Sequence, residues 1–357
     1  MFALLALAGG ARANPPASSS PGTPPSPNSG VARPIGNHSF LPSAGSNENS
    51  STKNENTIIW RQLVRIPADA PAYCGIRIAF LNGHYPGANH PFVPDAAVIR
   101  TATLQAGPIG HQTILGQFTW SRSKSHVFQP GEETKSDPLP VCLQPGTDAF
   151  IAGWTQLAQP GPGAFPLSFS VISPGEAMRA GNGLADNTKV AGDSYEAGTA
   201  AAASDGPFAV YGVPANASQP GICLVGDSLT AGLGDSPTGF TPLTGDGHGD
   251  YGAYQRAVWA AGYGMAKIAR SGTLAQDFHL TTQWRDALWQ CSRAVILFGT
   301  NDLYWGLPVK DIEQSLLDIW MAAAVRTGHP AVARTLPPRT ASVDQWATTT
   351  GQTVRNS

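Results

Sequence analysis

Residues 221–232 read Gly-Ile-Cys-Leu-Val-Gly-Asp-Ser-Leu-Thr-Ala-Gly, an apolar run that breaks into a turn of small residues around Ser228. The run has the length and composition of a buried strand, and the residues behind it are typical of a turn into a helix. A serine at such a turn stands clear of the sheet, where backbone N–H groups can face a developing oxyanion. The stretch therefore predicts Ser228 as a nucleophile, while an ordinary Gly-Asp-Ser turn remains the alternative.

Two more strand-to-turn junctions follow in the chain. Residues 291–298 read as a buried parallel strand that runs into Gly-Thr-Asn-Asp at 299–302. Residues 263–270 read as another strand, which runs into Ser271-Gly272. Asn-Asp and Ser-Gly are also common turn dipeptides. Three such motifs in this order, each at the carboxyl end of a predicted strand, favour the functional interpretation.

Together the three motifs resemble blocks I, II and III of the GDSL, or SGNH, family of serine esterases and lipases. The resemblance implies a flavodoxin-like α/β/α fold in which Ser228 attacks an acyl ester carbonyl. It also implies that the oxyanion is held by the backbone N–H groups of Ser228 and Gly272 and by the side-chain amide of Asn301. Supporting residues, which orient the nucleophile and oxyanion loops, would be Asp227, Gly299 and Asp302.

The base that activates the serine has no match in this sequence. In the family it is the histidine of a C-terminal Asp-x-x-His, and no Asp-x-x-His occurs in these 357 residues. His248 falls in a Gly-rich run, His279 follows block II near the start of a predicted helix, and His329 lies at a helix-ending signal. None of the three is predicted to be the base.

We expect this gap to reflect a C-terminal truncation. Residues 331–339 resemble the family's fourth strand with the loop after it, and residues 344–357 resemble the start of the next helical segment. The last strand, the Asp-x-x-His and the closing helix would then lie beyond Ser357, so that the hydrolase domain at 215–357 lacks its C-terminal part. The alternative is a non-catalytic carbohydrate-binding protein with a degenerate SGNH-like domain.

The N-terminal 56 residues look non-globular. Residues 1–13 combine a short apolar run with an Ala-x-Ala ending, which predicts a signal peptide although no basic segment precedes the run. That run is too short to span a bilayer. Residues 14–56 are rich in Pro, Ser, Asn and Gly and predict a disordered linker.

From residue 57 to about residue 200 the sequence predicts a β-sandwich domain. Short strands of alternating polarity, separated by Gly/Pro-rich loops, are expected at 58–66, 75–81, 96–102, 116–120, 149–154 and 167–172. This segment resembles the β domain that precedes the hydrolase in some secreted bacterial GDSL proteins, on its Trp-Arg-Gln strand, the strand from Arg77 to Asn82 and the turn Ser136-Asp137-Pro138. Its aromatic residues are expected mainly in the core.

Four cysteines allow three full pairings. Cys74 and Cys142 both fall in the β domain and could form a disulfide after export. Cys223 and Cys291 are expected to stay buried thiols, because Cys291 should lie about two residue pairs too near the amino end of its strand to meet Cys223.

The remaining composition narrows the function. Twenty-two basic and 24 acidic residues give a net charge of −2, with no basic stripe, so nucleic acid is not an expected partner. No cofactor and no metal are expected, because no cluster has metal-ligand spacing. The resemblance to the GDSL family implies a secreted or periplasmic bacterial esterase acting on acetyl or short-chain acyl esters, with an acylated polysaccharide as the favoured substrate. Tyr304 and Trp305 are expected to serve packing, with a place in the acyl or sugar site as the alternative. Oligomeric state is left open.

Overall fold

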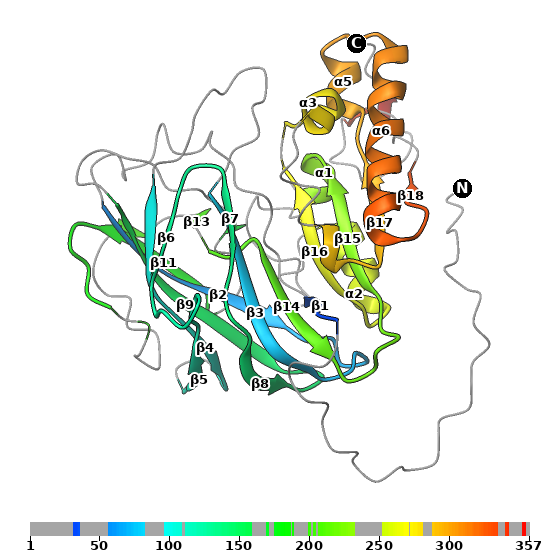
Figure 1. Cartoon of the computed structure of the whole chain (residues 1–357). Helices are drawn as coiled ribbons and strands as arrows, with labels where there is room; N and C mark the ends of the chain where they lie inside the picture. The colour runs from blue at the N-terminus through cyan, green and yellow to red at the C-terminus, as the bar shows by residue number, and fades with distance from the viewer. Residues whose placement is uncertain are drawn as a thin grey trace, which may run out of the picture.

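A computed structural model describes residues 31–35, 56–82, 96–108, 111–158, 169–170, 175–186, 188, 199–200, 203–204, 206–232, 252–270, 272–280, 288–334, 340–342 and 352–354. Antiparallel strands form one part of the molecule, and a parallel sheet with helices lies beside it (Figure 1). His248 and the predicted signal peptide lie outside the described residues.

The antiparallel part contains two larger sheets. One has the order β1-β14-β3-β7, with β8 also paired to β3; the other has the order β12-β11-β2-β9-β4-β5, with β6 also paired to β4. The strands of the first are β1 (Arg33–Ile35), β3 (Tyr73–Asn82), β7 (Glu132–Lys135), β8 (Leu139–Leu143) and β14 (Ala209–Pro214). Those of the second are β2 (Thr57–Arg65), β4 (Ala97–Ala106), β5 (Thr113–Gln117), β6 (His126–Phe128), β9 (Asp148–Leu157), β11 (Ala177–Gly181) and β12 (Thr199–Ala200). Strands β10 (Phe169–Ser170) and β13 (Ala203–Ser204) form a separate pair.

One apolar core is shared by these two sheets. Trp60 of β2 meets Phe80 of β3 edge to face, with 5.9 Å between ring centroids. Gly153 stands opposite Trp60 in the ladder, and a Cβ there would overlap the indole ring. The glycine therefore makes room for the largest side chain of the core. The expectation that the aromatic residues of these strands are mainly core holds for Trp60, Phe80, Phe118, Trp120, Phe128 and Phe150, all of which are buried.

Two boundaries differ from the sequence prediction. The predicted disordered linker 14–56 contains β1, which pairs antiparallel with β14. Its proline is tolerated because β1 is an edge strand, and Ile35 is fully buried in the core. The predicted break between 57–200 and 215–357 also misses β14, which belongs to the antiparallel sheet. An apolar pattern of three to six residues was too short to reveal either strand.

The parallel sheet has the order β16-β15-β17-β18. Its strands are β15 (Gly221–Gly226), β16 (Gly264–Ala269), β17 (Arg293–Leu297) and β18 (Val332–Ala333). All three pairings are parallel, with Gly226 opposite Ala269 on one side and Leu297 on the other. The three strand-to-turn junctions of the sequence therefore end at one edge of the sheet, and the predicted fourth strand is present as β18.

Helices cover both faces of this sheet. Tyr254 and Val258 of α2 (Ala253–Ala260) pack against Ile222, Leu224 and Met265 on one face. On the other, α3 (Ala275–Leu280) and α6 (Val309–Thr327) pack through Phe278 and Ile319 over Val225 and Ile296. The short helices are α1 (Ser228–Ala231), η2 (Leu288–Gln290) and α5 (Thr300–Tyr304).

The C-terminal segment differs from the expectation of a helix at 344–357. Residues Gln352–Val354 form β20, which pairs antiparallel with β19 (Thr340–Ser342). Thr353 and Val354 are β-branched, and such residues favour extended backbone over helix.

Strand β1 also joins the antiparallel and parallel parts. Gly221 and Gly264, which begin β15 and β16, both lie against Pro34, so that a Cβ on either glycine would overlap it. Arg33 Nη1 donates to the carbonyl of Gln290 at 3.4 Å. Residues of β3 and β14 share an apolar cluster with Cys223 and Ala266 of the parallel sheet. The two parts are thus packed together through β1 and the outer face of β3 and β14.

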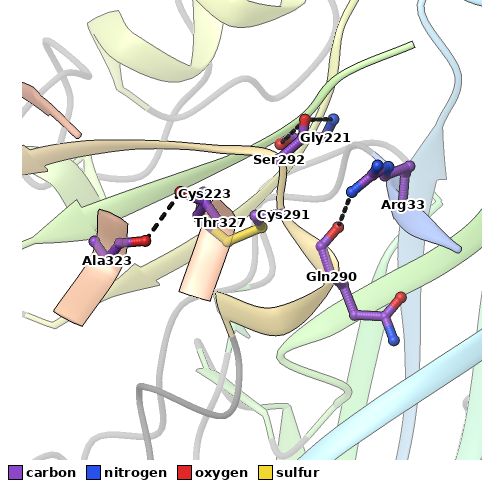
Figure 2. The surroundings of a disulfide bond; sticks show 8 residues. All are labelled: Arg33, Gly221, Cys223, Gln290, Cys291, Ser292, Ala323 and Thr327. Carbon is purple, nitrogen blue, oxygen red and sulfur yellow. Dashed lines mark hydrogen bonds between the residues drawn. A yellow bond between two sulfur atoms is a disulfide. The ribbon is translucent and has the colours of Figure 1, made fainter. Parts of the chain in front are cut away.

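All four cysteines form disulfides, each within its own part of the molecule. Cys74 pairs with Cys142, as the sequence allowed, and Cys223 pairs with Cys291 with 5.7 Å between their Cα atoms (Figure 2). The expectation that Cys223 and Cys291 stay thiols is wrong. Cys223 stands opposite Ala294 in the ladder. Cys291 is three residues before Ala294, so in an extended strand the two residues would lie roughly 10 Å apart. The chain instead leaves η2 at Cys291, whose N–H bonds to the carbonyl of Leu288, and this bend returns the cysteine toward β15.

We predict that both disulfides stabilise the protein by similar amounts. Each closes a loop with a sequence separation of 68 residues. The loss of conformational entropy in the unfolded chain then stabilises the folded protein by about 4 kcal/mol for each disulfide. The double variants Cys74→Ala/Cys142→Ala and Cys223→Ala/Cys291→Ala are therefore a matched pair for thermal melting. Peptide mapping without reductant should show both linkages; recovery of Cys223 and Cys291 as free thiols in the folded, oxidised protein would contradict the structure.

Candidate active site

Ser228 begins α1 at the point where the central strand β15 ends. Asp227 is the N-cap of α1, and its Oδ1 accepts a hydrogen bond from the N–H of Leu229 at 3.0 Å. Gly226 leaves no room for a side chain, because a Cβ there would overlap the hydroxyl of Thr230 and the carbonyl of Leu297. The sequence Gly-Asp-Ser therefore fits this junction for steric and capping reasons, and both place Ser228 at the carboxyl edge of the sheet.

The other end of α1 is held by Lys267 of β16. This lysine is fully buried, and its Nζ donates to the carbonyl of Ala231, the last residue of α1, at 3.2 Å. A cation at a helix C-terminus is favourable and satisfies a carbonyl that has no partner within the helix. Sequence analysis missed this residue, since a lysine in an apolar strand carries no local signal of what it bonds to.

Gly272 and Asn301 lie on either side of β15, after its two neighbouring strands. The chain beyond β16 is tied to the nucleophile strand by the N–H of Arg270, which donates to the carbonyl of Gly226 at 3.1 Å. Gly272 is exposed, has φ of +77°, and would meet nothing with an added Cβ. The side-chain Nδ2 of Asn301 donates to the carbonyl of Thr273 at 3.0 Å. This amide carries two N–H bonds, and the second remains for a ligand.

Asp302 fixes the start of α3. Its Oδ2 accepts from the N–H of Ala275 at 3.0 Å and its Oδ1 from the N–H of Gln276 at 3.4 Å. A carboxylate that receives backbone N–H groups at a helix start is stabilised by charge-assisted hydrogen bonds. Asp302, from the turn after β17, thereby holds the segment after β16 in place.

Burial sets the charge state of Asp227. The side chain is fully buried, and this burial raises its pKa to about 6. The hydrogen bond from Leu229 opposes the rise, and the negative charge of Asp302 adds to it. Oδ2 of Asp227 has no hydrogen-bond partner among the described residues. Removal of the negative charge at this position should therefore favour the folded state above pH 6.

The predicted site residues thus lie on three adjacent strand ends, in the order Gly272, Ser228, Asn301. Gly299 is the N-cap of α5 with φ of +114°, a backbone conformation that favours glycine. Tyr304 and Trp305, at the end of α5, are 55% and 60% exposed and meet edge to face at 5.4 Å. The expectation that these two aromatic residues serve packing therefore does not hold, because both side chains are exposed.

Of the three histidines that follow Ser228 in the chain, the structure describes His279 and His329, and both lie outside the turn that bears Ser228. His279 is in the last turn of α3, not at the helix start as predicted, and His329 is exposed just after α6. The N–H of His329 donates to the hydroxyl of Thr327, the last residue of α6. The helix therefore ends just before His329, as the sequence signal predicts. That neither histidine supplies the base stays a prediction. Within the described residues no group of His, Cys, Asp and Glu could hold a metal ion.

Another missed feature is the pair Arg334 and Tyr254. The guanidinium carbon of Arg334 lies 4.3 Å from the ring centroid of Tyr254. Arg334 follows β18 and Tyr254 lies on α2, so the contact joins segments that are far apart in the sequence. No helix in the described part of the chain has both the length and the apolar character needed to cross a membrane.

Residues 224–356 match the model of the GDSL-like Lipase/Acylhydrolase family, which identifies this part of the chain as a GDSL-like hydrolase domain. No curated protein matches the chain.

Similar solved structures include esterases. The psychrotrophic esterase EstA from Pseudoalteromonas sp. is 19% identical with a TM-score of 0.25, over 33% of this chain and 61% of that one, so the match spans less than two thirds of EstA. A family two carbohydrate esterase from Clostridium thermocellum in complex with cellohexaose is 10% identical, with a TM-score of 0.29, over 86% and 78% of the two chains. A carbohydrate esterase family 2 enzyme from Corynascus thermopiles is 14% identical, with a TM-score of 0.28, over 89% and 81%.

We predict that Asp227→Asn changes how stability depends on pH. The pKa of Asp227 is raised to about 6 in the folded protein, so the folded state binds the proton more tightly than the unfolded chain does. The stability this provides is present below the unfolded pKa and is lost as the pH rises through about 6. Asparagine keeps the capping oxygen without the charge. The variant should therefore gain stability relative to the wild type between pH 4 and pH 7, by on the order of 2 kcal/mol.

Thermal melting at closely spaced pH values measures this difference. Asp311→Asn, in the first turn of α6, is the matched control for loss of an acidic group on a helix. Melting curves of Asp227→Asn and wild type that keep a constant separation from pH 4 to pH 7 would contradict the assignment.

Proposed function

We propose that the protein is a serine esterase that forms an acyl-enzyme on Ser228. The observation that carries this proposal is the juxtaposition of three strand ends: the Gly-Asp-Ser turn on β15 lies between Gly272 after β16 and Asn301 after β17. A nucleophile flanked by rigid N–H donors is what acyl transfer needs, because charge develops on the carbonyl oxygen during attack.

The proposed chemistry has two steps. Oγ of Ser228 bonds to the acyl carbon, and the tetrahedral oxyanion accepts hydrogen bonds from the N–H groups of Ser228 and Gly272 and from Nδ2 of Asn301. The carbon–alkoxide bond then breaks, and the alcohol leaves with the proton that the serine lost. Water next attacks the acyl-enzyme, which releases the carboxylic acid and restores Ser228.

For the substrate we propose an acetyl or short-chain acyl ester, carried by a polysaccharide. Tyr304 and Trp305 lie within four residues of Asn301, and both side chains are exposed, so a ligand beside Asn301 can reach them. A flat apolar ring with a polar edge suits the face of a sugar. The exposed aromatic pair therefore favours a carbohydrate as the alcohol part of the ester.

We further propose a secreted or periplasmic bacterial protein with a β-sandwich domain and a flavodoxin-like hydrolase domain. The two antiparallel sheets around one core support the sandwich, and the parallel order β16-β15-β17-β18 agrees with the flavodoxin-like order. Two disulfides support an oxidising compartment.

The nucleophile assignment is tested by Ser228→Ala. In protein expressed from the complete coding sequence, this change should lower hydrolysis of p-nitrophenyl acetate by several orders of magnitude, because only residual catalysis survives loss of the nucleophile. Ser218→Ala is the matched control: Ser218 is exposed, its hydroxyl donates to Oδ1 of Asn216 at 2.7 Å in the turn before β15, and its loss should leave turnover unchanged. Turnover by Ser228→Ala within a few-fold of wild type would overturn the proposal.

Asn301→Ala tests the oxyanion role. We expect kcat to fall roughly a hundred- to a thousandfold, as is usual when one preorganised donor is deleted. Steady-state kinetics with p-nitrophenyl acetate separate kcat from KM. A rise in KM with unchanged kcat would show that Asn301 binds the ground state and transition state equally.

A further inference from the structure

Arg334 lies on the same face of the parallel sheet as α2. Val332 of β18 stands opposite Val295 of β17, and Val295 packs in the apolar cluster under α2. Side chains alternate along a strand, so Arg334, two residues after Val332, points to that face as well. Its N–H donates to the carbonyl of Ile296 at 3.3 Å, which continues the ladder and fixes its backbone.

The side chain of Arg334 extends toward the strand that bears the nucleophile. Its guanidinium lies over the ring of Tyr254, 4.3 Å from the centroid, while Tyr254 packs with Ile222 and Leu224 of β15. Arg334 must therefore reach across β17 from the edge strand. Gly252, two residues before Tyr254, lies against Gly232 at the end of α1, which places this part of α2 beside the helix of Ser228. Burial raises the pKa of Tyr254 above its usual value. The positive charge of Arg334 opposes this rise, and the negative charge of Asp227 adds to it.

Arg334 is exposed and has no acidic partner among the described residues. The buried carboxylates near Ser228 are already engaged by backbone: Asp227 by Leu229, and Asp302 by Ala275 and Gln276. A cation–π contact with Tyr254 does not use the N–H groups of the guanidinium as hydrogen-bond donors to a carboxylate. A planar fork with free edges suits a carboxylate, which it can bind with two parallel hydrogen bonds.

We propose that Arg334, held by Tyr254, binds a carboxylate on the alcohol part of the ester substrate. The substrate class is then an acyl ester of an acidic sugar, such as an acetylated uronic acid, in place of a neutral glycan. This inference rests on the proposed esterase function and adds the charge of the substrate to it.

A pair of small esters with the same acyl group tests the proposal. 4-Acetoxybenzoate carries a carboxylate on its leaving group, and 4-acetoxybenzamide is its neutral counterpart. Wild-type protein from the complete coding sequence should show the larger kcat/KM for the anionic ester, and added salt should reduce that advantage. Arg334→Gln should lower kcat/KM for 4-acetoxybenzoate roughly ten- to a hundredfold, the range for loss of a charged hydrogen-bonded pair. The neutral ester should change by less than about threefold.

Two further variants separate recognition from folding. Arg334→Lys keeps the charge but not the fork, so part of the preference for the anionic ester should return. Arg326→Gln removes an exposed arginine from the last turn of α6, which leads into the amino end of β18, and should leave the preference unchanged.

The two proposals fail in different ways. If Arg334→Gln lowers both esters equally, or if wild type shows no preference between them, the carboxylate site is overturned while the esterase function stands. If Ser228→Ala hydrolyses both esters as fast as wild type, the esterase function itself fails. Competitive inhibition of wild type by free galacturonate, lost in Arg334→Gln, would support the acidic sugar as the source of the carboxylate.

Discussion

The site depends on two adjacent side chains in the turn after β17, which hold the segment after β16. Asn301 donates to the carbonyl of Thr273, and Asp302 receives the N–H groups of Ala275 and Gln276. Hydrogen bonds to a charged group contribute about 1.5–3 kcal/mol each, about twice the value for neutral pairs. Because these bonds run between loops on opposite sides of β15, they fix Gly272 and Asn301 relative to the serine between them. In the proposed mechanism these two residues are oxyanion donors, and this arrangement positions them before any substrate arrives, which is the condition under which such donors are effective.

This arrangement has an electrostatic cost. The negative charge of Asp302 contributes to the raised pKa of the buried Asp227. Two cations also lie around this site: Lys267 bonds to the end of α1, and Arg334 lies over Tyr254 on the α2 face. The two cations differ in burial, and so in role. Lys267 is enclosed and can serve only the protein, whereas Arg334 is exposed and can also serve a ligand.

The sequence predicts that Ser228, Gly272 and Asn301 follow the ends of neighbouring strands, because a local pattern specifies each position, whereas their catalytic roles remain proposals. A strand of five or six mostly apolar residues followed by a small-residue turn identifies Ser228, Gly272 and Asn301 without knowledge of the fold, and the parallel pairing then brings the strand ends together. What the sequence could not predict was long-range. The bond between Cys223 and Cys291 depends on a bend at η2, β1 depends on its pairing with the distant strand β14, and the Arg334–Tyr254 contact depends on the order of strands. None of these features produces a pattern of residues within its own segment from which it could be predicted.

The opposite end of β15 explains how a four-residue helix can hold Ser228, the proposed nucleophile, in place. At its amino end the strand is fixed by three independent contacts: Ser292 exchanges hydrogen bonds with Gly221, Pro34 of β1 packs on the same glycine, and Cys223 is bonded to Cys291 (Figure 2). A helix as short as α1 has little stability of its own, because forming the first turn is unfavourable. Its geometry must therefore be imposed from both sides, by an immobile strand before Ser228 and by Lys267 and the Asp227 cap around it. The antiparallel part of the molecule contributes to this through β1, since the strand that completes its sheet edge also packs against the start of the nucleophile strand.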